Sequence, residues 1–466
     1  MAKVEFQNEN ITIEVDEGVT ILEAARKAGV TIESPCNGTG VCGKCRVKVD
    51  GKSADNILHG NGHRLSKEEE LEGYVLACEA RIKGDIIVKT SESHKHRDLK
   101  ILDHGKSFDL MVDAFIHKRY DEDKDITYVY AGEKLLGSEG GNTVHESFGV
   151  VVDIGTTTLV ASLVDLNSGK ELDSISALNP QAVHAQDVLS RIKLASEKSG
   201  LKLMYSVLIV SINQMITRLA QKNSIKAERI YEVVFSGNTC MLHLASNTNP
   251  YSLGRFPYEP EITGDVHLKA SEHNLAISKF GIIYLPPVIS AYVGADITSG
   301  ILASQLHEKK GVTLFVDIGT NGEMVLACDG RLWATSTAAG PAFEGMNITH
   351  GMRAGAGAIE FFNVEDAGTV TVKTIGEEEA TGICGSGLLD IVGELVYYGA
   401  INKNGKLVEP ETEGILPALR ERILKQDGKL VFKVTDRVVL TQKDIRQVQL
   451  AKGAVRAGIE FLLRSK

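Results

Sequence analysis

Apolar and polar residues alternate at the start of the chain and predict a β-hairpin followed by a helix. Residues 4–6 and 11–15 place an apolar side chain at every second position, and residues 8–10 between them are the turn-forming Asn-Glu-Asn. Thr20 stands three residues before Glu23, which is the spacing of a capping box. We therefore expect a helix that begins near Thr20, directly after the hairpin.

Later segments complete the pattern of this first region. The helix is expected to end at Gly29, because glycine tolerates the left-handed backbone that closes many helices. Residues 45–49 and 85–89 carry β-branched residues and predict strands, with residues 71–80 between them. The order of hairpin, helix, cysteine-containing loop and strands indicates an α+β domain.

A strand–turn–strand pattern occurs twice in the rest of the chain. Residues 150–161 run Val-Val-Val-Asp-Ile-Gly-Thr-Thr-Thr-Leu-Val-Ala, and residues 313–326 run Thr-Leu-Phe-Val-Asp-Ile-Gly-Thr-Asn-Gly-Glu-Met-Val-Leu. Each copy predicts a buried strand, a D-x-G-T turn and a second strand. One copy alone would suit an ordinary glycine hairpin, but two copies that each open a long α/β segment predict a duplicated α/β fold.

Three stretches have the periodicity of helices. Residues 187–198 and 444–463 carry apolar residues on one face, and Thr441 with Asp444 is a capping pair for the second stretch. Residues 201–219 form the most apolar long window, but charged and amide side chains interrupt it. We expect a buried or amphipathic helix there and no membrane span.

Composition and charge are those of an ordinary soluble protein. The 466 residues are too many for one domain, and 43% hydrophobic with 24% charged residues is a typical globular balance. A net charge of −10, with no block of lysine or arginine, argues against a nucleic-acid partner. The seven cysteines do not form a disulfide framework, and residues 1–4 lead into a strand pattern without an apolar leader. We expect a cytoplasmic protein without a membrane partner.

Weak patterning separates the first region from the repeat. Residues 91–97 are polar and charged, and further on only residues 110–115 and 126–130 suggest short strands. We expect a movable tether here. The predicted domains are residues 1–93, a linker at 94–147, a first lobe at 148–311 and a second lobe at 312–466.

Four cysteines supply the clearest chemistry. Cys36, Cys42 and Cys45 have the spacing C-x5-C-x2-C, and Cys78 follows in a separate segment. Four thiolates from one tight loop and one distant residue are how proteins hold a 2Fe–2S cluster. Glycines in the loop let the backbone fold closely around such a cluster and bring amide N–H groups toward the sulfurs. The sequence therefore predicts a one-electron centre.

Zinc and Rieske-type sites are the alternatives. Four cysteines also suit tetrahedral zinc, but zinc sites usually show two short cysteine pairs, and Cys78 stands alone. His59 and His63 lie in the loop before Cys78, yet no cysteine is missing from the set, so we expect them to be solvated loop residues. The other cysteines lie singly in apolar surroundings: Cys240, Cys328 and Cys384.

The two D-x-G-T turns have the chemistry of phosphate binding. Glycine permits a tight turn whose N–H groups point at an anion, and threonine hydroxyls add donors. Asp153 and Asp317, at the strand ends, can hold Mg²⁺ against the phosphates directly or through water. Two such turns facing each other would bind a nucleoside triphosphate from both sides. The remaining candidate nucleotide-binding residues are Gly155, Thr156, Thr157, Gly319, Thr320, Asn321 and Gly322.

Both parts of the chain resemble known folds. The cysteine-containing region resembles the β-grasp ferredoxin domain, and its first gap of five residues is closer to the adrenodoxin-like branch than to the plant-type pattern. The repeated turns resemble the two phosphate loops of the superfamily of sugar kinases, acetate kinases, actin and heat-shock chaperone ATPases. The resemblance implies an α+β β-grasp ferredoxin domain followed by two α/β actin-like (ribonuclease H-like) lobes.

The fusion of these parts closely resembles the reductive activators of corrinoid-dependent methyltransferases. The resemblance covers nearly the whole chain and includes further motifs: Asn179-Pro180-Gln181, Ser236-Gly237-Asn238-Thr239 and Gly382-Ile383-Cys384-Gly385-Ser386-Gly387. It implies that the cobalt of a corrinoid protein is returned from Co(II) to Co(I) with an electron from an upstream donor and with help from ATP. It also implies that Asp153 and Asp317 bind the Mg²⁺–nucleotide.

One departure and three alternatives accompany this prediction. The family has a glycine-rich loop against the adenosine after the last predicted helix. This sequence runs to Arg464-Ser465-Lys466 without a Gly-Gly pair, so we expect a second lobe that is truncated at its C-terminus. The first alternative is an ATP-independent ferredoxin carrier whose lobes dock a corrinoid protein. The others are a small-molecule kinase with a redox-sensing domain and a dehydratase-type activator with a shared 4Fe–4S cluster, and a homodimer is left open.

Overall fold

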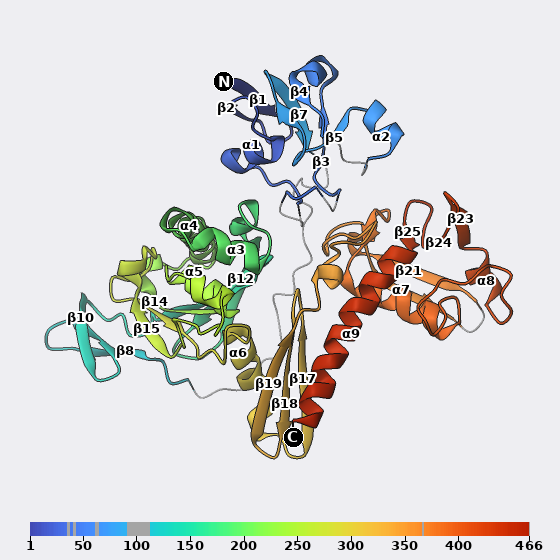
Figure 1. Ribbon diagram of the computed structural model, residues 1–466. Coiled ribbons are helices and arrows are strands. Elements are labelled where there is room, and N and C mark those ends of the chain that lie inside the picture. The colour runs from blue at the N-terminus through green and yellow to red at the C-terminus, as the bar shows by residue number, and fades with distance from the viewer. Residues whose placement is uncertain (35–37, 41–42, 61–64, 91–111, 366–367, 466) are drawn as a thin grey trace. The chain divides into compact units, whose positions relative to one another are not determined.

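The computed structural model describes residues 1–34, 38–40, 43–60, 65–90, 112–365 and 368–465 (Figure 1). The chain divides into two compact units, one formed by residues 101–307 and the other by residues 1–100 together with 308–466. Separate sheets and cores distinguish three regions: the N-terminal domain (1–90), the first lobe (112–307) and the second lobe (308–465).

The N-terminal domain is a mixed sheet packed against helix α1 (Ile21–Ala28). The sheet order is β2-β1-β7-β3-β5, in which β1 is antiparallel to β2 and parallel to β7. The strands are β1 (Ala2–Phe6), β2 (Ile11–Val15), β3 (Arg46–Val49), β5 (Tyr74–Leu76) and β7 (Ile86–Thr90). The shorter elements are η1 (Gly51–Asn56), β4 (Ile57–Leu58), α2 (Lys67–Leu71) and β6 (Arg81–Ile82). The predicted hairpin, helix and final strand are confirmed.

Helix α1 has the ends that the sequence predicts. Thr20 Oγ1 accepts the Glu23 N–H at 3.2 Å, and Glu23 Oε2 accepts the Thr20 N–H at 2.9 Å, which completes the capping box. Gly29 closes the helix in left-handed backbone with a φ of 71°. Ile21 and Leu22 are buried in the core of the domain, so the apolar face of α1 points toward the sheet.

The first lobe is built on a six-stranded sheet in the order β13-β12-β11-β14-β16-β15. Its strands are β11 (Phe148–Ile154), β12 (Thr158–Asp165), β13 (Glu171–Leu178), β14 (Ile230–Gly237), β15 (Val266–Lys269) and β16 (Ile282–Leu285). Strand β11 is antiparallel to β12 and parallel to β14, with Ile154 opposite Gly237. Because parallel strands end at the same edge of a sheet, the turn after β11 lies beside the segment after β14.

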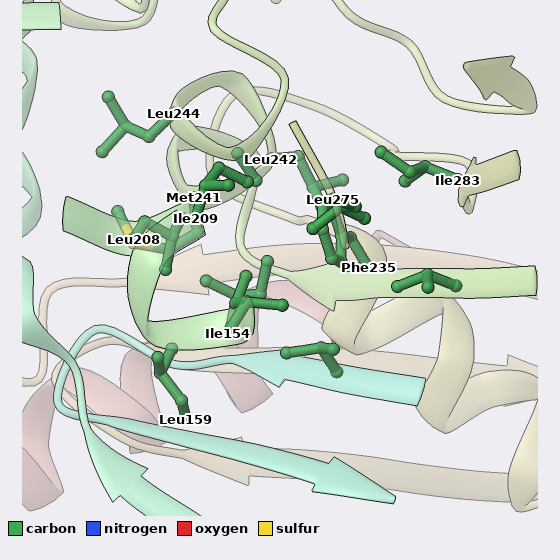
Figure 2. Close-up of a cluster of buried hydrophobic side chains, with 14 of the residues drawn as sticks. Ile154, Leu159, Leu208, Ile209, Phe235, Met241, Leu242, Leu244, Leu275 and Ile283 are labelled. Atoms are coloured by element: carbon green, nitrogen blue, oxygen red, sulfur yellow. The ribbon is translucent and has the colours of Figure 1, made fainter. Parts of the chain in front are cut away.

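The helices of the first lobe include ones at the predicted stretches 187–198 and 201–219, whereas those at 239–245 and 295–303 are not predicted from the sequence. They are α3 (Val188–Ala195), α4 (Lys198–Lys222), α5 (Thr239–Ala245) and α6 (Ala295–Ala303), with short 3-10 turns η3 (Pro180–Val183), η4 (Ala227–Arg229), η5 (Tyr251–Gly254), η6 (Ala270–His273) and η7 (Leu306–Glu308). Figure 2 shows the buried cluster in which Leu208 and Ile209 of α4 lie near Ile154 and Met241. Helix α4 is long and apolar enough to cross a membrane by length and composition, but 50% of its apolar window is buried. Packing in this core accounts for its apolar composition.

A three-stranded antiparallel sheet occupies much of the segment that is expected to be a linker. Its strands, in the order β10-β9-β8, are β8 (Ile116–Asp121), β9 (Ile126–Ala131) and β10 (Lys134–Gly140). Ile116 and Val129 are buried together with Tyr231 of β14, so the sheet packs on the first lobe. The expected linker at 94–147 is corrected accordingly, because residues 116–140 are folded.

Polar residues inside this small sheet explain why its pattern is weak in the sequence. The side chain of Lys118 is only 1% exposed, and its Nζ lies 3.4 Å from Glu139 Oε2. Arg229 binds the same carboxylate oxygen at 2.6 Å. Since charged side chains occupy inward positions, apolar alternation does not mark β8 and β10, and β8 begins after the 110–115 segment where a strand is expected. The strand that is expected at 126–130 is present as β9.

In its described residues, the second lobe contains three small sheets and two longer helices. The sheets are β17 (Val312–Ile318), β18 (Gly322–Cys328) and β19 (Arg331–Thr337); β20 (Ala358–Val364), β21 (Val370–Thr374) and β22 (Gly382–Ile383); and β23 (Ile423–Gln426), β24 (Lys429–Lys433) and β25 (Val439–Thr441). The helices are α7 (Gly385–Tyr397), α8 (Pro417–Arg420) and α9 (Gln442–Arg464), with η8 (Pro341–Glu344) and η9 (Ile375–Glu377).

The second copy of the repeat is less buried than predicted. Val312 and Ile318 of β17 are 54% and 48% exposed, whereas Met324 and Leu326 of β18 are fully buried. In the described part of the chain β17 pairs only with β18, so it is an edge strand. The apolar pattern correctly predicts a strand, but it does not show how many neighbours cover that strand.

Helix α9 confirms the predicted C-terminal helix. Thr441 Oγ1 accepts the Asp444 N–H at 3.2 Å and Asp444 Oδ2 accepts the Thr441 N–H at 2.9 Å, as in a capping box. The predicted inner face packs as expected: Val448, Ala451 and Leu462 are buried, and Val455 and Ile459 contact the cluster around Met324.

Candidate functional site

Cys45 and Cys78 bring two of the predicted cluster ligands together. Cys45 directly precedes β3 and Cys78 follows β5, and these two strands are paired. Their Sγ atoms are 3.2 Å apart, well beyond the length of a disulfide bond. Cys36 and Cys42 lie outside the described residues. The two described thiols therefore converge on one point, as ligands of a shared group would.

The backbone around Cys78 is fixed from two sides. The Ala77 N–H donates to Cys45 O at 2.8 Å, and the Leu22 N–H of α1 donates to Ala77 O at 2.8 Å. Gly38 has a φ of +89°, and a Cβ on it would lie 3.3 Å from Leu22 Cδ2 and 3.8 Å from Cys78 Cβ. Only glycine adopts this backbone easily at such close approach. Two thiols that converge beside a close glycine loop fit a thiolate-bound iron–sulfur cluster.

Among the residues that the structure describes, no further cysteine or histidine forms a metal-binding group with this pair. His59 is exposed, as expected of a loop residue, and His63 lies outside the described residues. Burial raises the pKa of the Cys240 thiol to about 12, which strongly disfavours the thiolate that metal binding needs. Cys384 is buried in the second lobe. Within the described ranges, no group of three or more His, Cys, Asp or Glu side chains is placed to hold a metal ion.

The first D-x-G-T turn follows β11, beside the end of β14. Asp153 lies on the exposed face of β11. A Cβ at Gly155 would lie 2.7 Å from Thr158 O, so the turn requires glycine. The candidate residues Asp153, Gly155, Thr156 and Thr157 therefore share one turn, and their role in nucleotide binding stays a prediction.

Side chains from three other segments hold this turn. Asn179 Nδ2 donates to Gly155 O at 2.7 Å, and Asn238 Nδ2 donates to Thr156 Oγ1 at 3.2 Å. The fully buried Arg191 donates from Nη2 to Thr156 O at 2.5 Å. The two asparagines belong to motifs that the sequence singles out. The sequence does not predict a role for Arg191. The one feature that could have drawn attention to it is its place next to the apolar residues of α3.

The second D-x-G-T turn links β17 to β18. Asp317 of β17 lies opposite Glu323 of β18 in the strand pairing. The side chain of Asp317 still reaches solvent, but the surrounding protein displaces enough water to raise its pKa. Glu323 is buried and accepts the Ser336 hydroxyl at 3.2 Å, while the Thr320 hydroxyl donates to Glu344. The candidates Gly319, Thr320, Asn321 and Gly322 share this turn, Glu323 is the last residue of the predicted second phosphate loop, and the sequence gives no signal for Glu344.

The two turns belong to different compact units of the chain. Each is a candidate phosphate-binding element, and their meeting around one nucleotide stays a prediction. The predicted turn before α7 is also present: a Cβ at Gly385 would lie 1.9 Å from Phe343 O, so glycine is required where this helix begins.

Three parts of the chain match described protein families. Residues 4–83 match the 2Fe-2S iron-sulfur cluster binding domain, residues 148–309 match the RACo middle region, and residues 311–466 match the C-terminal domain of RACo, the ASKHA domain. The chain is therefore a ferredoxin-type iron–sulfur domain joined to an actin-like ATPase fold, as the sequence predicts.

Similar proteins identify the family. A solved "Reductive activator for corrinoid,iron-sulfur protein" is 30% identical with a TM-score of 0.66, and the match covers 100% of this chain and 84% of that one. The "Corrinoid activation enzyme RamQ" of Eubacterium limosum is 35% identical over 320 residues, 67% of this chain and 54% of the relative. The chain belongs to the family of reductive activators of corrinoid proteins, which confirms the resemblance.

A further relative is more distant. The Co(II) methylated amine-specific corrinoid protein reductase of Methanosarcina barkeri is 26% identical over 340 residues, 66% of this chain and 58% of the relative. The chain thus spans little more than half the length of these curated relatives.

Proposed function

We propose that this chain passes single electrons to the corrinoid cobalt of a methyltransferase and so returns Co(II) to Co(I). The observation that carries the proposal is the convergence of Cys45 and Cys78 in a ferredoxin-type domain on the same chain as two D-x-G-T turns. The relatives described as a corrinoid activation enzyme and a Co(II) corrinoid protein reductase support this reaction. One electron enters from an upstream donor and one leaves to Co(II).

The N-terminal domain is proposed to hold the electron. Cys45 and Cys78, together with Cys36 and Cys42, would bind a 2Fe–2S cluster, which supplies a one-electron centre when bound. Cys45 is buried, whereas Cys78 is partly exposed. The side of the site at Cys78 is therefore where we expect the corrinoid protein or the electron donor to approach.

ATP with Mg²⁺ is proposed to bias the transfer. Each ~59 mV of adverse potential costs about tenfold in the equilibrium constant of a one-electron step, so a very negative acceptor needs an additional driving force. A nucleotide provides one only if it binds two states of the protein unequally. We assign Mg²⁺ coordination to Asp153 and Asp317, and phosphate contacts to the turns that follow them.

The partners follow from this reaction. They are a corrinoid protein of a methyltransferase and a protein or enzyme that reduces the N-terminal domain. The acidic net charge of −10 favours partners with basic surfaces over nucleic acid. We place the protein in the cytoplasm, where free thiols such as Cys240 stay reduced.

A reconstitution assay tests the electron-transfer half of the proposal. The anaerobically purified chain, a chemical reductant and a Co(II) corrinoid protein are mixed, and Co(I) is followed by its absorbance. Cys45→Ser should abolish the conversion, whereas Cys328→Ser, the same substitution at a half-buried cysteine of the second lobe, should preserve it. Undiminished conversion by Cys45→Ser would sink the proposal.

The same assay separates the leading function from its alternative. An ATP-assisted activator should form Co(I) faster or further when MgATP is added. An ATP-independent carrier should give the same Co(I) yield and rate with and without MgATP.

A further inference from the structure

We propose that Asn179, Arg191 and Asn238 are positioning residues that preform the first D-x-G-T turn as a phosphate-binding element. The inference rests on the proposed nucleotide function of this turn and deepens it. All three residues lie in the first lobe and act through the turn, at Gly155 and Thr156.

The carbonyl oxygens of Gly155, Thr156 and Thr157 each accept a hydrogen bond from another segment of the first lobe. Gly155 O accepts from Asn179 Nδ2 at 2.7 Å, Thr156 O accepts from Arg191 Nη2 at 2.5 Å, and Thr157 O accepts from the Asn179 N–H at 2.9 Å. In a planar trans peptide the C=O and the N–H of the next residue point in opposite directions. Holding the first two carbonyls therefore directs the N–H groups of Thr156 and Thr157 away from the lobe.

These two N–H groups have the disposition of an anion site. Among the residues that the structure describes, neither the Thr156 N–H nor the Thr157 N–H donates a hydrogen bond. Successive backbone N–H groups that point outward from a glycine turn form a concave site for phosphate oxygens. Because the carbonyls are already tied down, little rearrangement is needed when an anion binds.

Asn238 sets the direction of the Thr156 hydroxyl. Asn238 Oδ1 accepts the Met241 N–H at 3.0 Å as the cap of α5, which fixes the amide so that Nδ2 faces Thr156. Nδ2 then donates to Thr156 Oγ1 at 3.2 Å. Since the hydroxyl oxygen accepts this bond, its hydrogen is left to donate to a phosphate oxygen.

Arg191 contributes both shape and charge. Its Nε donates to Ala185 O at 3.0 Å and its Nη1 donates to Gln181 Oε1 at 3.0 Å, while Nη2 holds Thr156 O. The planar guanidinium reaches these acceptors together, which a lysine ammonium cannot do. A buried positive charge directly behind the turn also attracts an anion bound in front of it.

Asn249 provides a matched control for Asn179. In both residues Oδ1 accepts the N–H two residues later, at 3.0 Å for Asn179 and 2.9 Å for Asn249. In both, Nδ2 donates to a distant carbonyl, which is Gly155 O for Asn179 and Ser196 O, at 3.1 Å, for Asn249. An Asn→Asp substitution keeps the acceptor and removes the donor at either site.

The test is the affinity of the full chain for MgATP, measured by isothermal titration calorimetry alongside thermal unfolding. We expect Asn179→Asp and Arg191→Lys to weaken binding about tenfold or more, since one lost charge-assisted or well-placed hydrogen bond is worth about 1.4 kcal/mol. Asn249→Asp should bind MgATP within about twofold of the unsubstituted chain.

A second variant keeps the test independent of misfolding. Asn238→Asp retains the cap on the Met241 N–H but draws the Thr156 hydroxyl hydrogen toward its own carboxylate, so it should weaken MgATP binding with little loss of stability. Unchanged affinity in Asn179→Asp and Asn238→Asp, or an equal loss in Asn249→Asp, would overturn the positioning role. If the unsubstituted chain does not bind MgATP, the proposed nucleotide function itself is wrong, and the positioning role falls with it.

Discussion

Asp444 is a buried carboxylate whose hydrogen bonds join helix α9 to the body of the second lobe. It is 0% exposed. Its Oδ2 accepts the Thr441 N–H at 2.9 Å and the Thr441 hydroxyl at 2.8 Å. Its Oδ1 accepts the Thr349 N–H at 2.7 Å and the Thr349 hydroxyl at 3.0 Å. We predict that Asp444→Asn strongly destabilises this lobe.

The expected magnitude follows from these four bonds. Asparagine keeps one oxygen as an acceptor but places an NH₂ group against the two donors that faced the other oxygen. Hydrogen bonds to charged groups contribute about 1.5–3 kcal/mol each, so the loss of two gives about 3–6 kcal/mol. Local relaxation reduces the cost toward the lower end of this range, ~3 kcal/mol. For a lobe of this size, that loss lowers Tm by roughly 6–12 °C.

Trp333 gives a direct readout of this change. It is the single tryptophan of the chain, and it packs with Leu462 of α9 in the cluster around Met324. Urea unfolding followed by tryptophan fluorescence therefore reports on the region that α9 holds together. The matched control is Asp436→Asn, whose side chain is 92% exposed and pairs with Lys433 at 2.7 Å, and which should change stability by less than about 0.5 kcal/mol. Equal, small effects of both substitutions would refute the reasoning.

Three further predictions concern the first lobe. Burial lowers the pKa of Lys118 in the folded state from 10.5 to about 8, so between pH 8 and 10.5 the unfolded state binds more protons than the folded state. Stability against urea, followed by circular dichroism, should therefore rise with pH over this range. Lys118→Met should flatten the rise. Burial also lowers the pKa of His243 below 6.5, so the free energy of unfolding should fall as pH falls through 6.5. If the His243→Gln variant loses stability with falling pH as steeply as the unsubstituted chain, the loss does not come from His243. Gly155→Ala should weaken MgATP binding about tenfold or more in calorimetry, because its Cβ would lie 2.7 Å from Thr158 O, and full affinity would show that the turn needs no glycine.

Features set by neighbouring residues are the ones that the sequence predicts well. The capping boxes at Thr20 and Thr441 and the closing glycine at Gly29 act within a few residues, so their spacing alone is enough. The repeat of the D-x-G-T turn predicts two strand pairs, and both are present. One tertiary contact is predicted as well: the cysteine set anticipates that Cys45 and Cys78 lie together, because the ligands of one cluster must converge.

Other features set by tertiary contact escape the sequence. Arg191 meets Thr156 only because α3 packs behind the turn, and no local pattern places an arginine side chain against a distant carbonyl. Strands β8 and β10 escape prediction because Lys118 and Glu139 occupy inward positions, whereas the alternation at residues 126–130 does predict β9. The exposure of β17 depends on which strands lie beside it, which hydrophobic alternation does not encode.

A single-turnover experiment tests the central claim most directly. The chain is reduced anaerobically to one electron per molecule, excess reductant is removed, and the protein is mixed with a Co(II) corrinoid protein while Co(I) absorbance and the cluster signal are recorded together. We predict that Co(I) appears as the reduced cluster signal disappears, one for one, and that the yield is higher with MgATP than with a non-hydrolysable analogue. Loss of the reduced cluster signal without Co(I), or an equal yield with both nucleotides, would contradict the account.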